Sequence, residues 1–105
     1  MIRTADDQSF NQVLMSHQGA TLVEFVTPSC PACRQIEPWL QGLTRKFPSL
    51  QVVKVDATRA PNAAAYFGVR MAPTLIVFRN GEPMQTIQGK PPTPHRLETF
   101  VAPYV

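Results

Sequence analysis

The sequence predicts an α/β fold, a layer sandwich in which helices cover both faces of a β-sheet. Patterns typical of helices and strands alternate along the chain in the order αβαβαββα. The strand-like segments are short apolar runs without polar alternation, which is typical of strands covered on both faces. With 105 residues, of which 44% are hydrophobic and 16% charged, the chain has enough material for one compact domain and too little for two. We therefore expect one domain over residues 1–105.

The first predicted elements are a helix over residues 6–16 and a strand over residues 21–26. Apolar residues recur at helical spacing in the first segment, and acidic residues stand in its first turn. The apolar positions are Phe10, Val13 and Leu14. Gly19 interrupts this pattern, and the run Thr-Leu-Val-Glu-Phe-Val that follows is rich in strand formers. This run predicts a strand in the middle of the sheet.

A second helix follows the two cysteines, because apolar residues there recur every three or four positions. Its buried stripe consists of Ile36, Trp39, Leu40, Leu43 and Phe47. The stripe makes Trp39 a packing residue rather than a functional one. Residues 51–55 predict the next strand. An alanine-rich helix over residues 61–67 follows, since Pro61 suits a first helical turn and Gly68 stands just past the end.

The last third of the chain predicts a β-hairpin and a final helix. Residues 74–78 form a third apolar strand, and the Asn-Gly pair at residues 80–81 suits a type I′ turn, which needs positive φ at both central positions. Residues 84–88 would be the returning strand. The Thr-Pro pair at residues 93–94 predicts an N-cap and a first-turn proline for a helix that runs to Val101.

The charge pattern excludes several classes of function. The net charge is +3, but the ten lysine and arginine residues are scattered and form no basic stripe interleaved with aromatics. No apolar run approaches the length that spans a membrane. The N-terminus turns polar and acidic at once, which does not fit a secretory signal. We expect a cytoplasmic monomer that binds neither nucleic acid nor a membrane.

The candidate functional site is the segment TPSCPACRQ at residues 27–35, which holds the only two cysteines of the chain. It follows a buried strand and opens a helix. Cys30 should therefore lie at the helix N-terminus, where unpaired N–H groups and the macrodipole stabilise a thiolate. Cys33 follows one turn later, within reach of an S–S bond. Cys30 would attack a partner disulfide, and Cys33 would then release the partner by attacking Cys30.

A structural disulfide and a metal site are the alternatives for this pair. A disulfide across three residues closes a very short loop, and its stabilising effect shrinks with loop length. A zinc site needs about four ligands, whereas His17 and His95 fall on separate predicted helices. We therefore expect a redox-active disulfide, with no metal and no organic cofactor.

Several segments, spaced in the right order over nearly the whole chain, resemble the thioredoxin family. They are LVEF at 22–25, CPAC at 30–33 with a proline five residues later, KVD at 54–56, YFGVR at 66–70, APT at 72–74, FRNGE at 78–82 and the glycine at 89. The resemblance implies the thioredoxin fold, in which a central mixed β-sheet is flanked by helices on both faces. It also implies a thiol–disulfide oxidoreductase that reduces protein disulfides and receives electrons from a separate reductase.

The resemblance also implies roles for positions around the two cysteines. Cys30 would be the exposed nucleophile and Cys33 the buried resolving thiol. Pro73 stands at the place of the family's cis-proline, next to the dithiol, where the preceding backbone pairs with an extended substrate segment. The other residues that would line the substrate groove are Pro31, Ala32 and Ala72.

One carboxylate stands inside the otherwise apolar strand at residues 21–26. Glu24 should be largely buried there, and burial raises the pKa of an acid. Thioredoxins usually place an aspartate at this position, beneath the resolving cysteine, with a lysine nearby on the next strand; this chain supplies Glu24 and Lys54. We expect Glu24 to take a proton from Cys33 when that thiol attacks, with Lys54 biasing the charge. The alternative is a purely structural ion pair of Glu24 with Lys54.

The site departs from the family's common Trp-Cys-Gly-Pro-Cys signature. Ser29 precedes the pair, and Pro31 and Ala32 lie between the cysteines. Ala72 stands where an isoleucine is common. Such positions tune the potential of a dithiol, for which about 30 mV corresponds to ~1.4 kcal/mol. A thiol oxidase or disulfide isomerase is therefore one alternative function, and a non-catalytic binding module is another. The intact dithiol argues against the binding module, which has no need of both sulfurs.

Overall fold

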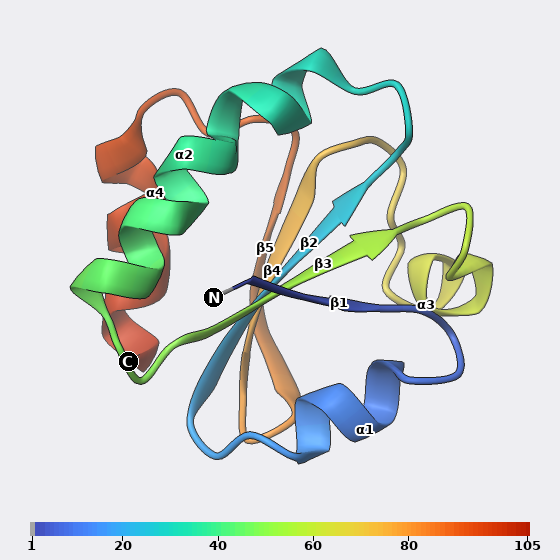
Figure 1. Cartoon of the computed structure of the whole chain (residues 1–105), viewed down its shortest axis with the longest axis horizontal. Helices are drawn as coiled ribbons and strands as arrows, with labels where there is room; N and C mark the ends of the chain where they lie inside the picture. The colour runs from blue at the N-terminus through green and yellow to red at the C-terminus, as the bar shows by residue number, and fades with distance from the viewer. Residues whose placement is uncertain (1) are drawn as a thin grey trace.

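The computed structural model describes residues 2–105 and contains a five-stranded sheet with helices on both faces (Figure 1). The strands are β1 (Ile2–Ala5), β2 (Ala20–Val26), β3 (Gln51–Asp56), β4 (Thr74–Arg79) and β5 (Glu82–Gln88). They lie in the order β1-β3-β2-β4-β5. β1 and β2 pair parallel with β3, whereas β4 is antiparallel to β2 and β5 is antiparallel to β4. The sheet is therefore mixed, as predicted.

Within the described residues, four α-helices cover the two faces of this sheet. They are α1 (Phe10–Met15), α2 (Pro31–Lys46), α3 (Pro61–Tyr66) and α4 (Pro94–Val101), and a short 3-10 turn, η1 (Ala102–Tyr104), follows α4. α2 and α4 lie on one side of the sheet, and α1 and α3 lie on the other (Figure 1). The predicted α/β layer sandwich is confirmed.

The sheet divides the hydrophobic core into two clusters. β2 shows this division, because successive side chains of a strand leave the sheet on opposite faces. Leu22 packs with α2 and α4, whereas Val23 and Phe25 pack with α1 and α3. Glu24 has the same parity as Leu22, so its side chain leaves the sheet on the face that α2 covers. The strand is buried from Ala20 to Phe25, as its apolar run predicts.

The N-terminal part of the chain differs from the prediction. The sequence pattern does not reveal β1, because its four residues are half polar and form a partly exposed edge strand. The helix predicted over residues 6–16 begins at Phe10 instead. The residues before it form a turn, in which the Asp6 carboxylate accepts hydrogen bonds from the N–H groups of Gln8 and Ser9, both at 3.0 Å. The acidic residues therefore precede the helix rather than occupying its first turn.

The β4–β5 hairpin follows the prediction. Asn80 and Gly81 both have positive φ, 52° and 82°, as a type I′ turn requires. The turn is held to the residue that precedes β2: the Gly19 N–H donates to the Asn80 side chain, and the Asn80 N–H donates to the Gly19 carbonyl, both at 3.0 Å. β5 begins earlier than predicted, and a register shift between β4 and β5 lies opposite Pro83.

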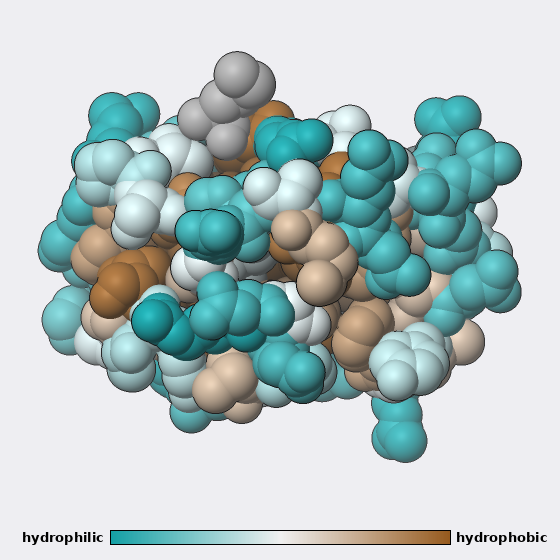
Figure 2. Space-filling model, turned by 90° about the horizontal axis from the view of Figure 1, so that it is seen from below, coloured by the Kyte–Doolittle hydropathy of each residue, from teal (hydrophilic) through white to brown (hydrophobic). Residues whose placement is uncertain are grey.

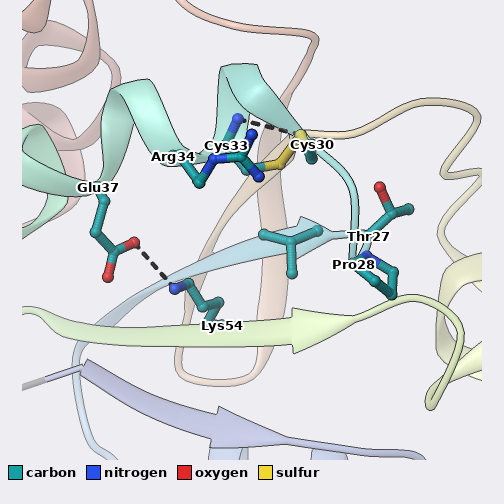
Figure 3. A pocket seen from close by; sticks show the side chains of 8 residues that line it. Thr27, Pro28, Cys30, Cys33, Arg34, Glu37 and Lys54 are labelled. Carbon is teal, nitrogen blue, oxygen red and sulfur yellow. Dashed lines mark hydrogen bonds and ion pairs between the residues drawn. A yellow bond between two sulfur atoms is a disulfide. The ribbon is translucent and has the colours of Figure 1, made fainter.

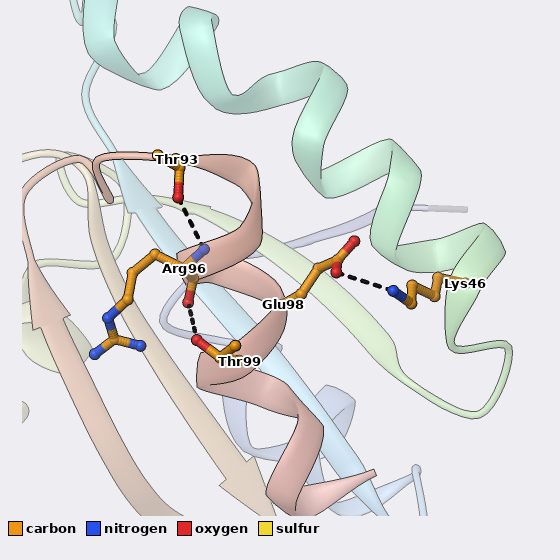
Figure 4. Close-up of polar contacts among 5 residues, drawn as sticks. All are labelled: Lys46, Thr93, Arg96, Glu98 and Thr99. Carbon is orange, nitrogen blue, oxygen red and sulfur yellow. Dashed lines mark hydrogen bonds and ion pairs between the residues drawn. The ribbon is translucent and has the colours of Figure 1, made fainter.

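Polar contacts hold α4 in place (Figure 4). Thr93 caps the helix as predicted, because its side chain accepts a hydrogen bond from the Arg96 N–H at 3.1 Å. Lys46 at the end of α2 forms an ion pair with Glu98 of α4, with 2.9 Å between Nζ and Oε2. The two helices that cover this face of the sheet are thus joined at their surface as well as through the core.

The surface on the side of α1 is largely hydrophilic. Figure 2 views the molecule from below Figure 1, the end at which α1 lies, and hydrophilic residues are mixed there with smaller hydrophobic areas. Within residues 2–105, every helix is too short or too polar to cross a membrane.

Candidate functional site

The two cysteines form a disulfide where the chain passes from β2 into α2 (Figure 3). Cys30 is the N-cap of α2 and has extended backbone angles, φ −135° and ψ 91°. Its Sγ accepts a hydrogen bond from the Cys33 N–H at 3.1 Å. The Cα atoms of Cys30 and Cys33 are 5.2 Å apart. The structure is therefore the oxidised form of the pair, and the predicted position of Cys30 at the helix start is confirmed.

The start of α2 favours negative charge at Cys30. The helix is 16 residues long, and its first turn contains no acidic residue. Pro31 occupies the first turn, where its missing N–H leaves no helical bond unmade. The Cys33 N–H that reaches Sγ in the disulfide can also donate to a thiolate after reduction. The helix dipole adds to this effect, since it stabilises negative charge at the N-terminus by up to ~2 kcal/mol.

The exposure of the sulfur-bearing residues differs from the expectation. The family pattern has Cys30 exposed and Cys33 buried, but both residues are 6% exposed. Cys30 is the N-cap of α2 and Cys33 lies in the first turn of this helix, and both positions are covered to the same degree. Both line a cavity of about 370 Å³, together with Thr27 and Pro28 of the preceding loop (Figure 3). This cavity gives the disulfide its access to solvent.

Charged side chains line the same cavity: Arg34, Glu37 and Lys54. The Lys54 Nζ of β3 lies 3.0 Å from the Glu37 Oε2 of α2, and these side chains are 33% and 35% exposed (Figure 3). Sequence reasoning did not single out Glu37. Its spacing is the signal that could have revealed it, because a residue four positions after Cys33 lies on the same face of the helix.

Glu24 is buried, as predicted. Its exposed fraction is 0%, and within residues 2–105 neither carboxylate oxygen has a hydrogen-bond partner. Burial raises the pKa of Glu24 to about 7; Lys54 acts to lower this pKa, and Glu37 acts to raise it. The carboxyl group is therefore close to half-protonated near neutral pH.

Lys54 lies beside Glu24 but does not pair with it. The two residues are register partners in the parallel pairing of β2 with β3, so their side chains leave the sheet on the same face. The Lys54 ammonium forms its ion pair with Glu37 instead. The alternative of a structural ion pair between Glu24 and Lys54 is therefore wrong. Lys54 acts on Glu24 as a nearby charge rather than as a hydrogen-bond donor.

The segment before β4 carries the expected cis-proline, since the Ala72–Pro73 peptide bond is cis. Pro73 is buried and Ala72 is half-buried; on α2, Pro31 is exposed and Ala32 is half-buried. Neither Ala72 nor Pro73 lines the cavity of the two cysteines. A second cavity of about 400 Å³ is lined by Gly68, Arg70, Met71 and Gln88. Sequence reasoning did not single out Met71. The structure makes it a candidate contact, because this apolar side chain is 52% exposed next to Ala72.

Three residues considered as metal ligands in the sequence, Cys30, Cys33 and His17, have other contacts in the structure. No group of three or more His, Cys, Asp or Glu side chains within residues 2–105 could hold a metal ion. His17, one of the histidines considered as a ligand, forms a hydrogen bond through Nε2 with the Ser49 carbonyl at 2.9 Å. The two sulfurs are bonded to each other.

Comparisons with known proteins point to one family. The family model described as Thioredoxin matches residues 1–102. The thioredoxin of Porphyra purpurea is 33% identical over 100 residues, which cover 94% of this chain and 92% of that protein. The chloroplastic thioredoxin M5 of Oryza sativa subsp. japonica is 31% identical over 102 residues; the match covers 96% of this chain but only 59% of the rice protein. The match to the X-ray structure of Fasciola hepatica thioredoxin covers 98% of this chain and 99% of that chain, with a TM-score of 0.87. Because the two sequences are 23% identical, this match shows a shared fold and no more.

Proposed function

This chain belongs to the thioredoxin family, and from this premise we propose which of its residues carry out the reduction of protein disulfides. The protein is a thiol–disulfide oxidoreductase of the protein-disulfide reductase type, and its redox-active group is a disulfide. The observation that carries the proposal is the Cys30–Cys33 disulfide at the N-terminus of α2, on the wall of a solvent-accessible cavity.

In the proposed reaction the reduced dithiol transfers two electrons to a substrate disulfide. The Cys30 thiolate attacks one substrate sulfur, a bond between Cys30 and the substrate forms, and the first substrate thiolate leaves. Cys33 then gives up its proton and attacks the Cys30 sulfur. This step releases the second substrate thiolate and forms the Cys30–Cys33 disulfide. The substrate disulfide is thus reduced to two thiols while the dithiol is oxidised.

The position of Cys30 supports its role as the nucleophile. It is the N-cap of α2, where the helix dipole and the Cys33 N–H favour a thiolate in the reduced form. Cys33 lies within the first turn of the helix, next to the Cys30 sulfur, and this position suits the resolving step. The Pro31-Ala32 pair between them distinguishes this site from the common Gly-Pro form.

Glu24 accepts the proton that Cys33 loses. A general base works best when its pKa lies near the working pH, and burial raises the pKa of Glu24 to about 7. Its oxygens have no hydrogen-bond partner among the described residues, which supports their availability to a proton. Its side chain leaves the sheet on the face covered by α2, the helix that carries Cys33. Lys54 biases the charge of Glu24 from the neighbouring strand.

An extended substrate segment would lie along the residues that precede β4 and the first turn of α2. The residues proposed to contact it are Pro31, Ala32, Ala72 and Pro73. Exposure supports this assignment for the first turn of α2, because Pro31 is exposed and Ala32 is half-buried. Ala72 has a small side chain and is half-buried, so we propose that it contacts the substrate mainly through its backbone.

The partners follow from the chemistry of the disulfide. Its substrates are protein disulfides, and a separate reductase must return two electrons to the Cys30–Cys33 pair after each turnover. A cytoplasmic location and a monomeric state stay predictions from the sequence; some relatives are described as chloroplastic. We also propose that residues 1–105 form a single domain, since both core clusters are built on one sheet.

The reduction potential of the Cys30–Cys33 pair tests the direction of electron flow. Equilibration of the purified protein with glutathione buffers measures it, and a reductase should have a potential well below that of the glutathione couple. A potential well above the glutathione couple would instead support the thiol oxidase or isomerase alternative. Pro31→Gly and Ala32→Pro, singly and together, would show how much of the value the residues between the cysteines set.

A trapping experiment tests the assigned order of the two cysteines. Cys33→Ser removes the resolving thiol, so mixed disulfides between Cys30 and target proteins should accumulate in cells. Cys30→Ser is the matched control, and it should accumulate far fewer, because the thiol at the helix N-cap is gone. Equal trapping by both variants would contradict the assigned order. An empty trap in both would favour the non-catalytic binding module.

A further inference from the structure

We propose that Glu37 is a positioning residue, whose carboxylate holds the Lys54 ammonium on the cavity wall and keeps it from pairing with Glu24. This inference rests on the proposed role of Glu24 as the acceptor of the Cys33 proton. It adds a residue that neither the sequence pattern nor the family resemblance singles out.

The contacts at the cavity wall carry the proposal. Lys54 Nζ lies 3.0 Å from Glu37 Oε2, and both side chains are about one-third exposed. Figure 3 shows the pair spanning the gap between α2 and β3. Glu24 stands beside Lys54 in the sheet, on the same face, yet its two oxygens have no hydrogen-bond partner in the part of the chain that the structure describes. The Lys54 ammonium therefore acts on two carboxyl groups, those of Glu24 and Glu37. It forms an ion pair with the partly exposed one, Glu37.

Glu24 and Glu37 compete for the Lys54 ammonium, and solvation determines what pairing with Glu24 would do to its pKa. Glu24 is 0% exposed, so a charge-assisted bond from Lys54 would stabilise its ionised form strongly. Lysine carries its charge on a flexible stem, and an ammonium released from Glu37 can turn toward a neighbouring acid. Glu37 thus affects Glu24 in two ways, by restraining Lys54 and by adding a negative charge of its own.

The charged groups that act on Glu24 come from two of the elements packed against it, β3 and α2. β3 contributes Lys54, and α2 contributes Glu37. The partner of Glu24 on β4 is Leu75, which carries no charge. In the oxidised protein the two cysteines are bonded to each other and hold no titrating thiol. The oxidised form is therefore the state in which the titration of Glu24 can be observed without interference from the dithiol.

The decisive experiment follows the side-chain carboxyl carbon of Glu24 by ¹³C NMR during a pH titration of the oxidised protein. The signal is assigned by its disappearance in Glu24→Gln. In wild type the midpoint should lie at about 7. In Glu37→Gln it should fall by about 1 unit or more, because an opposite charge that comes within hydrogen-bonding range lowers the pKa of an acid by ~1–3 units. A midpoint that stays in place or rises overturns the proposal.

Two further variants separate positioning from a general effect of charge. Glu98→Gln removes the Lys46–Glu98 ion pair at the surface and changes the net charge by the same amount, so it should leave the Glu24 midpoint unchanged. An equal fall in Glu98→Gln and Glu37→Gln would overturn the proposal. In a Lys54→Gln background, Glu37→Gln should shift the midpoint much less than in wild type. An undiminished shift there would mean that Glu37 acts only through its own charge, which also overturns the positioning role.

The pH profile of disulfide reduction distinguishes this inference from the proposed function. If Glu24 must be ionised to accept a proton, the rising limb of the rate in Glu37→Gln should move to lower pH together with the NMR midpoint. If Glu37→Gln moves the NMR midpoint of Glu24 but not the pH profile of the rate, the restraint of Lys54 by Glu37 is retained and Glu24 is rejected as the proton acceptor. Conversely, Glu24→Gln could alter the pH profile of the rate while Glu37→Gln leaves the NMR midpoint of Glu24 in place. That result would retain the role of Glu24 and overturn the proposal for Glu37.

Discussion

Replacing Glu24 by glutamine should change how the free energy of unfolding depends on pH. Glutamine keeps the size of the side chain but cannot ionise. In the folded oxidised protein the pKa of Glu24 is about 7, compared with the ordinary value of 4.5. Unfolding therefore releases a proton from Glu24 at pH values between these two, so the contribution of this group to stability falls as the pH rises.

The size of the effect follows from the two pKa values. A rise from 4.5 to about 7 corresponds to ~3 kcal/mol, because each unit is worth about 1.4 kcal/mol. This contribution is fully present below about pH 4.5 and is lost as the pH rises through about 7. Domains of this kind are usually stable by roughly 5–15 kcal/mol, so the loss is a large share of the total. Glu24→Gln lacks this pH-dependent contribution. Its free energy of unfolding relative to that of wild type should therefore rise by ~3 kcal/mol from about pH 4 to about pH 8.

Urea unfolding of the oxidised proteins across this pH range measures the effect. The quantity to follow is the free energy of unfolding of Glu24→Gln minus that of wild type, because the contributions of the other titrating groups cancel. Glu98→Gln is the matched control; its difference from wild type should vary far less with pH, since the Lys46–Glu98 pair lies at the surface. If the difference for Glu24→Gln were as flat as that of the control, burial would not hold a proton on Glu24, and the predicted linkage would be refuted.

Unfolding measurements on three further substitutions test the fold. Gly81→Ala should cost ~1 kcal/mol, because φ at this position is 82° and the new methyl would lie 2.8 Å from the Met15 Sδ, which has to move; an unchanged stability would contradict this. Thr93→Ala should cost ~1 kcal/mol through the loss of the α4 cap, and Thr99→Ala in the same helix should cost less; equal costs would contradict the role of Thr93. Leu40→Ala should cost ~2–5 kcal/mol, since Leu40 is 0% exposed, and a cost near zero would mean that it does not fill the core.

The elements that could be predicted from the sequence are those with a local physical signal. Asn80 and Gly81 tolerate positive φ, and the structure uses them in the turn that requires it. Thr93 offers a side-chain oxygen where a helix begins, and the helix N-terminus uses it. The apolar run of β2 predicted a strand covered on both faces, which also made the burial of Glu24 predictable.

The features that could not be predicted depend on contacts between distant parts of the chain. β1 is placed by its pairing with β3 and by the packing of Ile2 and Ala5 against the core clusters, while its own residues carry a weak strand signal. The equal exposure of Cys30 and Cys33 could not be predicted either, because the spacing of the cysteines permits a bond between them but does not show what covers each residue. Lys54 was expected to act on Glu24 because the resemblance to the thioredoxin family implies a lysine on the next strand near this acid. The ion pair of Lys54 with Glu37 depends on how α2 packs over β3, which the sequence pattern does not specify.

The choice of partner made by Lys54 decides what Glu24 can do. A direct bond to the ammonium would hold Glu24 as a carboxylate well below neutral pH, because a charge-assisted bond in a buried place favours the ionised form. Such an acid would be a weak base for a thiol proton, since proton transfer is most effective when the pKa of the base lies near the working pH. With Lys54 bonded to Glu37, burial prevails and the pKa of Glu24 lies at about 7. The same burial destabilises the folded state at alkaline pH, so the cost in stability and the capacity for proton transfer have one physical origin.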